Sequence, residues 1–186
     1  MRPTERIKEA QRVLEAEAKA IFASSKKISL NFSKCIDLII DCKGTVVISG
    51  IGKSGNIGKK ITSTLASLGT PSIFLHTSDA FHGDLGILRR NDLLICISNS
   101  GETDELVRLL NYANRNDIKS IAITGNVNST ISKEASISLN SSVESEACPL
   151  NLAPTCSTSV TMALGDALAS ICAMERGFKE IDFARF

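Results

Sequence analysis

Two short segments of the sequence combine glycine with hydroxyl side chains in a way that could bind an anion. They are Gly50–Gly55 and Ser98–Thr103. Their candidate side chains are Lys53 and Ser54 in the first segment, and Ser98, Ser100 and Thr103 in the second. Glycine lets backbone amides approach an anion, and hydroxyls beside the free amides of a helix N-terminus can hold a phosphate. Because helix capping would explain one hydroxyl and not three, the two segments favour a phosphate-ester site.

The glycine segment taken alone is weaker evidence. GIGKSG lacks the spacing of a P-loop, in which four residues separate the first glycine from the Gly-Lys-Ser run. Its glycines match a dinucleotide fingerprint, but no acidic residue ends a plausible second strand. A purely structural turn would explain this segment at least as well.

Both histidines of the chain, His76 and His82, fall within the short segment His76–Gly86. A metal site there would need three or four ligands, and the segment offers no compact set, so we expect no metal. Acid–base chemistry or hydrogen bonding to a sugar suits histidine better. A structural role explains His76 about as well as a functional one, and His82 is the stronger candidate.

A long segment, 144–158, offers a carboxylate and further hydroxyls. Long ordered loops at the ligand-binding edge of an α/β domain are usually functional. The candidates here are Glu146, Ser157 and Thr158. From the residues alone, Glu146 is better explained as a solvated surface charge.

Alternating patterns along the chain predict the elements that position these segments. Short apolar, β-branched runs predict five strands, at 45–49, 72–75, 93–97, 120–124 and 137–139. Apolar residues spaced three and four positions apart predict a helix at about 7–21, capped by Thr4. The same spacing predicts helices at 32–42, 56–68, 103–116 and 157–175. We therefore expect one domain over 1–186, a doubly wound five-stranded parallel α/β sheet preceded by an N-terminal helical pair. In such sheets ligands bind at the carboxyl ends of the strands.

Composition excludes several classes of partner. The chain has 186 residues, 43% of them hydrophobic, which is enough for one core. It has 21 basic and 20 acidic side chains, no Trp and one Tyr, so we expect no nucleic-acid partner. The charged N-terminus does not resemble a signal peptide, and no uninterrupted apolar run approaches the length of a membrane span. We therefore expect no membrane association. The six cysteines form no CxxC pair, which favours free thiols in the cytoplasm.

Five motifs in order carry a resemblance to a known family. They are GIGKSG, HGDLG, SNSGETDE, SEACPLNLAPTCST and GDALA, and they resemble the SIS (sugar isomerase) domain of arabinose 5-phosphate isomerases from about Cys42 to Phe183. The resemblance implies a doubly wound sheet, a homotetramer, and the interconversion of D-ribulose 5-phosphate and D-arabinose 5-phosphate. This reaction is the first step toward the Kdo sugar of lipopolysaccharide and capsules.

The resemblance also implies roles for individual residues. It places Ser54, Ser98, Ser100 and Thr103 on the phosphate, Lys53, His82, Glu105 and Glu146 among the catalytic or substrate-positioning groups, and Ser157 and Thr158 against the sugar. Moving a carbonyl from C1 to C2 passes a proton through an enediolate, for which a base of near-neutral pKa is suited. Lys53 could stabilise the developing oxyanion. No redox cofactor is needed, and we expect none.

Two family features lie outside residues 1–186. The segment like Asp182–Phe186 is followed in the family by His-Pro-Gly-Gly, whose histidine is a leading catalytic candidate, and long members then carry a pair of CBS domains. Three alternatives also follow from the sequence: a non-catalytic sugar-phosphate sensor, an SIS isomerase for another ketose phosphate, and a nucleotide-binding dehydrogenase. The missing acidic ribose ligand disfavours the last of these.

Overall fold

The computed structural model describes residues 1–184, and its centre is a five-stranded sheet. All neighbouring strands are parallel, in the order β2-β1-β3-β4-β5. The strands are β1 (Val46–Gly50), β2 (Ser72–Phe74), β3 (Leu93–Ile97), β4 (Lys119–Thr124) and β5 (Ile137–Asn140). The predicted α/β fold is therefore confirmed, and every strand boundary lies within one residue of its predicted position.

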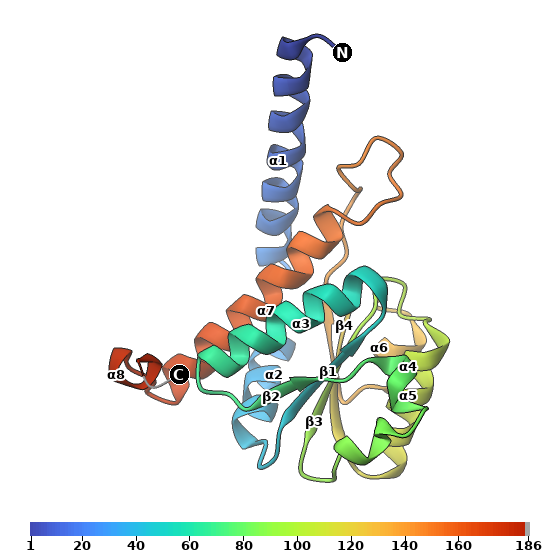
Figure 1. Ribbon diagram of the computed structural model, residues 1–186, viewed down its shortest axis with the longest axis vertical. Coiled ribbons are helices and arrows are strands. Elements are labelled where there is room, and N and C mark those ends of the chain that lie inside the picture. Colours follow the sequence, from blue (N-terminus) through green and yellow to red (C-terminus); the bar gives the residue numbers. More distant parts are fainter. Residues whose placement is uncertain (185–186) are drawn as a thin grey trace.

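Helices cover both faces of the sheet (Figure 1). One face carries α2 (Leu30–Asp41), α3 (Gly52–Ser67) and α7 (Cys156–Glu175), and the other carries α4 (Thr77–Ala80), α5 (Asp104–Arg115) and α6 (Thr130–Glu134). Side chains alternate along each strand, so Ile48 packs into the first layer and Val47 into the second. Strands β1 and β3 are buried on both faces, which explains their continuous apolar runs.

Helix α1 (Pro3–Ser25) lies outside this sandwich, packs against α7 and extends away from the sheet (Figure 1). Much of its surface is free, with Ile7 60% and Leu14 69% exposed. Two short elements, η1 (Asp84–Ile87) and α8 (Glu180–Phe183), complete the described chain. The predicted helical pair before the first strand is thus present.

Some predicted helix ends are wrong. Arg2, not Thr4, caps α1, because Pro3 takes the first helical position and the Arg2 amide donates to the Glu5 carboxylate at 2.8 Å. Helix α2 begins at Leu30, after the cap Ser29.

Helix α3 begins at Gly52, four residues before the predicted start. Its first turn contains Lys53 and Ser54 but no inward-facing apolar residue, so hydrophobic periodicity could not reveal it. The short helices α4, η1, α6 and α8 were not predicted either, because four or five residues are too few for a period of 3.6.

Within residues 1–184, α7 is the one helix long and apolar enough to cross a membrane, with a mean hydropathy of 1.3 over its apolar window. Half of that window is buried inside the protein. Gly165 lets α7 approach α3 closely, since a Cβ at this position would lie 2.4 Å from Ile61. The apolar character of α7 is therefore accounted for by its place in the core.

Cysteine thiols in the described residues are unpaired. Burial raises the pKa of both Cys35 and Cys96 to about 12. These thiols stay protonated at neutral pH and pack as small apolar side chains.

Candidate active site

The strand order locates the site. The chain passes from β1 outward to β2 and then returns across β1 to β3, so the direction of winding reverses between β1 and β3. Loops diverge at such a switch point and leave a crevice at the carboxyl ends of the two strands. The segments that follow β1 and β3 carry Ser54 and Ser98, so the two predicted anion-binding segments flank this crevice.

The three predicted hydroxyls after β3 lie together. The Ser98 Oγ is 2.9 Å from the Thr103 Oγ1 and 3.4 Å from the Ser100 Oγ. Ser98 Oγ also accepts the Gly101 amide at 3.0 Å, and Ser100 Oγ accepts the Glu102 amide at 3.2 Å. The loop turns at Gly101, where φ is +71° and a Cβ would lie 2.0 Å from the Ser129 Oγ. The resulting cluster of hydroxyls and amides suits a phosphate, and its occupation by one stays a prediction.

Ser54 lies with the residues predicted to contact the sugar. It lines a small pocket together with Asn99, Pro154, Ser157 and Thr158. This pocket joins the first turns of α3 and α7 to the loop after β3. Larger hollows of about 440 and 550 Å³ lie beside α2 and α1, and none of the predicted site residues lines them.

Glu146 is held by hydrogen bonds, so its interpretation as a solvated charge is wrong. One carboxylate oxygen accepts the Thr155 amide at 2.7 Å, the Thr155 hydroxyl at 3.0 Å and the Ser157 amide at 3.2 Å. The other oxygen accepts the Ser157 hydroxyl. Burial acts to raise the pKa of Glu146, but the bonds from Ser157 and Thr155 outweigh it and hold this pKa below its usual value. The carboxylate therefore stays ionised at neutral pH and caps the N-terminus of α7.

The remaining predicted catalytic side chains approach the same sheet edge from separate strand ends. Lys53 lies in the first turn of α3, His82 after α4 and Glu105 in the first turn of α5. Lys53 and His82 are exposed, and Glu105 is half-buried. Within residues 1–184 no hydrogen bond or ion pair joins the side chains of these three to one another or to Glu146. The fold gathers them on one edge without bringing them into contact.

Three polar residues of this region were not selected from the sequence. Asn99 lines the pocket, Thr155 bonds Glu146, and His76 has a buried Nδ1 with no partner in the described residues. Asn99 and Thr155 lie inside SNSGETDE and SEACPLNLAPTCST, and a search for amides beside the chosen hydroxyls would have found Asn99. No group of three or more His, Cys, Asp or Glu side chains in residues 1–184 could hold a metal ion, and a metal-free reaction stays a prediction.

Replacing Ser100 with alanine should weaken sugar-phosphate binding by about 1–2 kcal/mol, the scale of a hydrogen bond to a charged group. Ser100 is the most informative of the three hydroxyls because it is exposed, whereas Ser98 is buried and supports the loop. Calorimetry with D-arabinose 5-phosphate measures the effect, with Ser33→Ala on the exposed face of α2 as the control. Equal affinity for wild type and Ser100→Ala would remove Ser100 from the phosphate site.

Comparisons with known proteins bear on the family and the fold. The model of the SIS domain family matches residues 38–171. The probable arabinose 5-phosphate isomerase of Haemophilus influenzae is 49% identical over 180 residues, which is 97% of this chain and 53% of that protein. Arabinose 5-phosphate isomerase KdsD of Pseudomonas aeruginosa is 48% identical over 178 residues, covering 96% of this chain and 55% of its own length. The chain thus spans about half the length of these curated relatives.

A solved structure, the E. coli CFT073 protein c3406 in complex with arabinose 5-phosphate, has the same fold. Its TM-score is 0.95 at 36% sequence identity, and the match covers 99% of this chain and 98% of that one. The resemblance carried by the five motifs is confirmed by sequence and by structure. The chain belongs to the SIS domain family.

Proposed function

We propose that this chain is an aldose–ketose isomerase that interconverts D-arabinose 5-phosphate and D-ribulose 5-phosphate. The observation that carries the proposal is the contact of Ser98 with Ser100 and Thr103 beside the β1–β3 crevice. Titratable side chains reach the same edge from the ends of four strands. The names of the relatives and the sugar-phosphate complex of the E. coli CFT073 protein support this choice of substrate.

In the proposed reaction the phosphate rests on the loop after β3, and the sugar extends toward Ser54, Ser157 and Thr158. A base removes the proton from one carbon, an enediolate forms, and the proton returns to the neighbouring carbon. His82 suits this exchange because an imidazole can accept a proton on one nitrogen and return it to the substrate. Lys53 would stabilise the enediolate oxygen. Oxidation of one carbon balances reduction of the other, so the reaction consumes no redox cofactor.

The two glutamates receive different roles in this proposal. The hydrogen bonds that lower the pKa of Glu146 also make it a poor proton acceptor at neutral pH, so it serves as a fixed negative charge that positions sugar hydroxyls. Glu105 lies in the first turn of α5, and within residues 1–184 its carboxylate accepts no hydrogen bond that would hold it in place. Glu105 is therefore the carboxylate available to share proton transfer with His82.

The test is a direct assay of the chain with D-arabinose 5-phosphate, in which NMR follows the formation of D-ribulose 5-phosphate. In D₂O the product should carry deuterium at the carbon that receives a proton from the enzyme. A chain extended beyond Phe186 is assayed in parallel, because the family has a histidine after this point. Binding without turnover in both chains would replace the isomerase proposal with the sensor alternative. Faster turnover of a hexulose phosphate than of D-arabinose 5-phosphate would identify the hexulose phosphate as the substrate instead.

D-arabinose 5-phosphate formed by this reaction would be the precursor of Kdo, and we place the step in the cytoplasm. The free cysteines of the described residues suit a reducing compartment. Transfer of the gene into a strain that lacks arabinose 5-phosphate isomerase activity tests the assignment. Growth without added D-arabinose 5-phosphate is the expected result, and continued dependence on it would contradict the assignment.

We further propose that the chain assembles with copies of itself, as the tetramer expected for its family, through the free face of α1. Ile7, Leu14 and Ile21 are spaced by seven residues, so they form one stripe on the helix, and they are 60%, 69% and 39% exposed. A second copy would bury this stripe.

Leu14→Glu should therefore shift the assembly to smaller species, because a charge would be placed in the buried stripe. Light scattering across a range of concentrations measures the effect, and Lys8→Glu, on another side of α1, is the control. A monomeric wild-type chain would contradict the assembly. An unchanged Leu14→Glu assembly would contradict the role of α1.

A further inference from the structure

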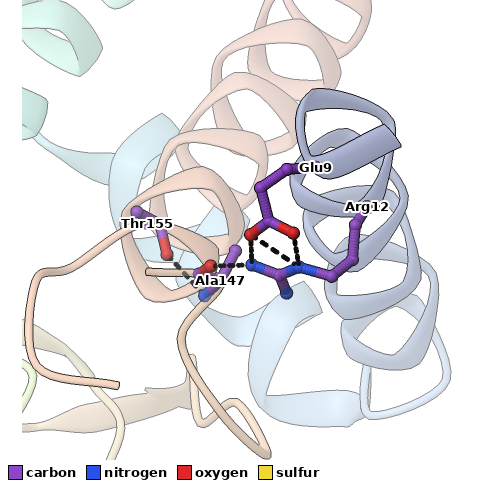
Figure 2. A network of polar contacts seen from close by, with 4 residues as sticks. All are labelled: Glu9, Arg12, Ala147 and Thr155. Atoms are coloured by element: carbon purple, nitrogen blue, oxygen red, sulfur yellow. Dashed lines mark hydrogen bonds and ion pairs between the residues drawn. The ribbon is translucent and has the colours of Figure 1, made fainter. Parts of the chain in front are cut away.

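Helix α1 holds the loop that carries Glu146. The Arg12 Nη2 donates a hydrogen bond to the Ala147 carbonyl at 2.6 Å, and Figure 2 shows the guanidinium reaching from α1 to this carbonyl. The two residues are 135 positions apart in the chain. Arg12 therefore fixes the carbonyl of Ala147, the residue after Glu146, from a distant helix.

The contact continues from Ala147 to the carboxylate. The Ala147 amide donates to the Thr155 Oγ1 at 2.8 Å (Figure 2). The Thr155 hydroxyl in turn donates to Glu146 at 3.0 Å. Because a hydroxyl has a single proton, accepting from Ala147 directs that proton toward Glu146. An unbroken series of polar contacts thus leads from the α1 guanidinium to the Glu146 carboxylate.

Arg12 is itself held in place one turn along α1. The Glu9 carboxylate accepts from the Arg12 Nε at 2.9 Å and from its Nη2 at 2.7 Å. The planar guanidinium can bond Glu9 and the Ala147 carbonyl together, which the point charge of lysine cannot reproduce. The side chains of Arg12 and Glu9 are about half exposed, at 48% and 42%, so their packing contribution is limited.

A second bond from α1 supports the other end of the loop. The Ser159 Oγ, in the first turn of α7, donates to the Glu17 carboxylate at 2.6 Å. The segment from Ala147 to Ser159 is therefore tied to α1 on both sides, and it contains Ser157 and Thr158, which line the small pocket.

We propose that Arg12 is a positioning residue of the isomerase: by holding Ala147 it orients the Thr155 hydroxyl and thereby fixes the Glu146 carboxylate beside the pocket of Ser54, Ser157 and Thr158. This inference rests on the proposed function for its catalytic part. Its structural part concerns the ligand-free chain and can be judged without turnover.

The first measurement is amide hydrogen exchange at Thr155 and Ser157, whose amides donate to Glu146. Arg12→Ala should accelerate exchange at both amides by about tenfold, because the loop then opens more often. Arg12→Lys, which keeps the charge but has all its donors on one nitrogen, should give an intermediate rate. The control is Arg2→Ala, because Arg2 forms the same kind of ion pair on α1, with Glu5, but does not touch the loop.

The second measurement is steady-state kinetics on the same variants. Arg12→Ala should lower kcat by about tenfold, as expected when Glu146, which positions the sugar for reaction, is displaced by a distant change. KM should change little, since within residues 1–184 no hydrogen bond joins the hydroxyl cluster after β3 to α1. Arg12→Lys should recover part of kcat, and Arg2→Ala should retain all of it. Melting temperatures of the Arg12 and Arg2 variants should agree.

Each outcome decides a distinct point. Unchanged exchange at Thr155 and Ser157 in Arg12→Ala would overturn the inference whether or not the chain turns over. Faster exchange with wild-type kcat would show that Arg12 does not position Glu146 for turnover. If neither wild type nor the chain extended beyond Phe186 shows turnover, the proposed function fails, and exchange alone then decides whether Arg12 holds Glu146.

Discussion

Replacement of His82 by alanine is expected to lower turnover of D-ribulose 5-phosphate by about 10²–10⁴-fold, the contribution of a general acid–base group. His82 is exposed, and its side chain makes no hydrogen bond or ion pair in residues 1–184, so truncation removes its chemistry without removing packing. Affinity for the sugar phosphate should change little, because the hydroxyl cluster that would hold the phosphate follows a different strand. Steady-state kinetics and calorimetry on the same protein separate the two effects.

The variant should be made in a chain extended beyond Phe186, because the family carries a further catalytic candidate, the histidine of His-Pro-Gly-Gly, after this residue. Arg89→Ala, an exposed change on the same connection between β2 and β3, is the control for disturbance of the loop. Wild-type turnover in His82→Ala would show that its assigned role is wrong. The histidine after Phe186 would then become the main candidate for proton transfer.

Glu146→Gln is expected to lower turnover by about 10–100-fold while the fold is retained. The glutamine Oε1 can accept the three donors of Thr155 and Ser157 that now share one oxygen, and its Nε2 can donate to the Ser157 hydroxyl. The substitution therefore removes the charge and keeps the geometry, and a hydrogen bond to a charged group contributes about 1.5–3 kcal/mol. Kinetics near neutral pH measure the loss. Full activity in Glu146→Gln would show that Glu146 caps α7 and has no role in turnover.

Glu146→Ala supplies the complementary result. It removes both the charge and the cap of α7, and it should lower the free energy of unfolding by about 1–2 kcal/mol, as for other lost N-caps. Because the pKa of Glu146 is lower in the folded than in the unfolded chain, its contribution is complete above the ordinary glutamate pKa and is lost as pH falls through the lowered value. The difference in unfolding free energy between wild type and Glu146→Ala should therefore shrink in acid.

Much of the fold could be predicted because its signals are local. Runs such as Leu93–Ile97 are buried on both faces, and continuous apolar character is the pattern that this burial imposes. The start of α3 could not be predicted in the same way. Its first turn, from Gly52, faces the crevice, and a helical turn without an inward apolar residue has no periodic signal.

The candidate site divides along the same line. Ser98, Ser100 and Thr103 lie within six residues, so one loop brings their hydroxyls together and the sequence could indicate them. The pocket that joins Ser54 to Ser157 depends on how closely α3 and α7 cross, which no local pattern specifies. The setting of Glu146 was likewise hidden, because its partners Thr155 and Ser157 meet it only after the intervening chain has folded back.

The contacts of α1 with α7 and its loop impose an order on biosynthesis. Glu17 and Ser159 form a hydrogen bond across 142 residues, so α1 must wait for this contact until the first turn of α7 has been made. At elongation rates of about 5–20 residues per second that interval is roughly 7–28 s. Throughout it the side chains that α1 later packs on α7, together with its Ile7 and Leu14 stripe, are uncovered on the nascent chain. Helix α1 is therefore open to chaperones and to premature association throughout this interval.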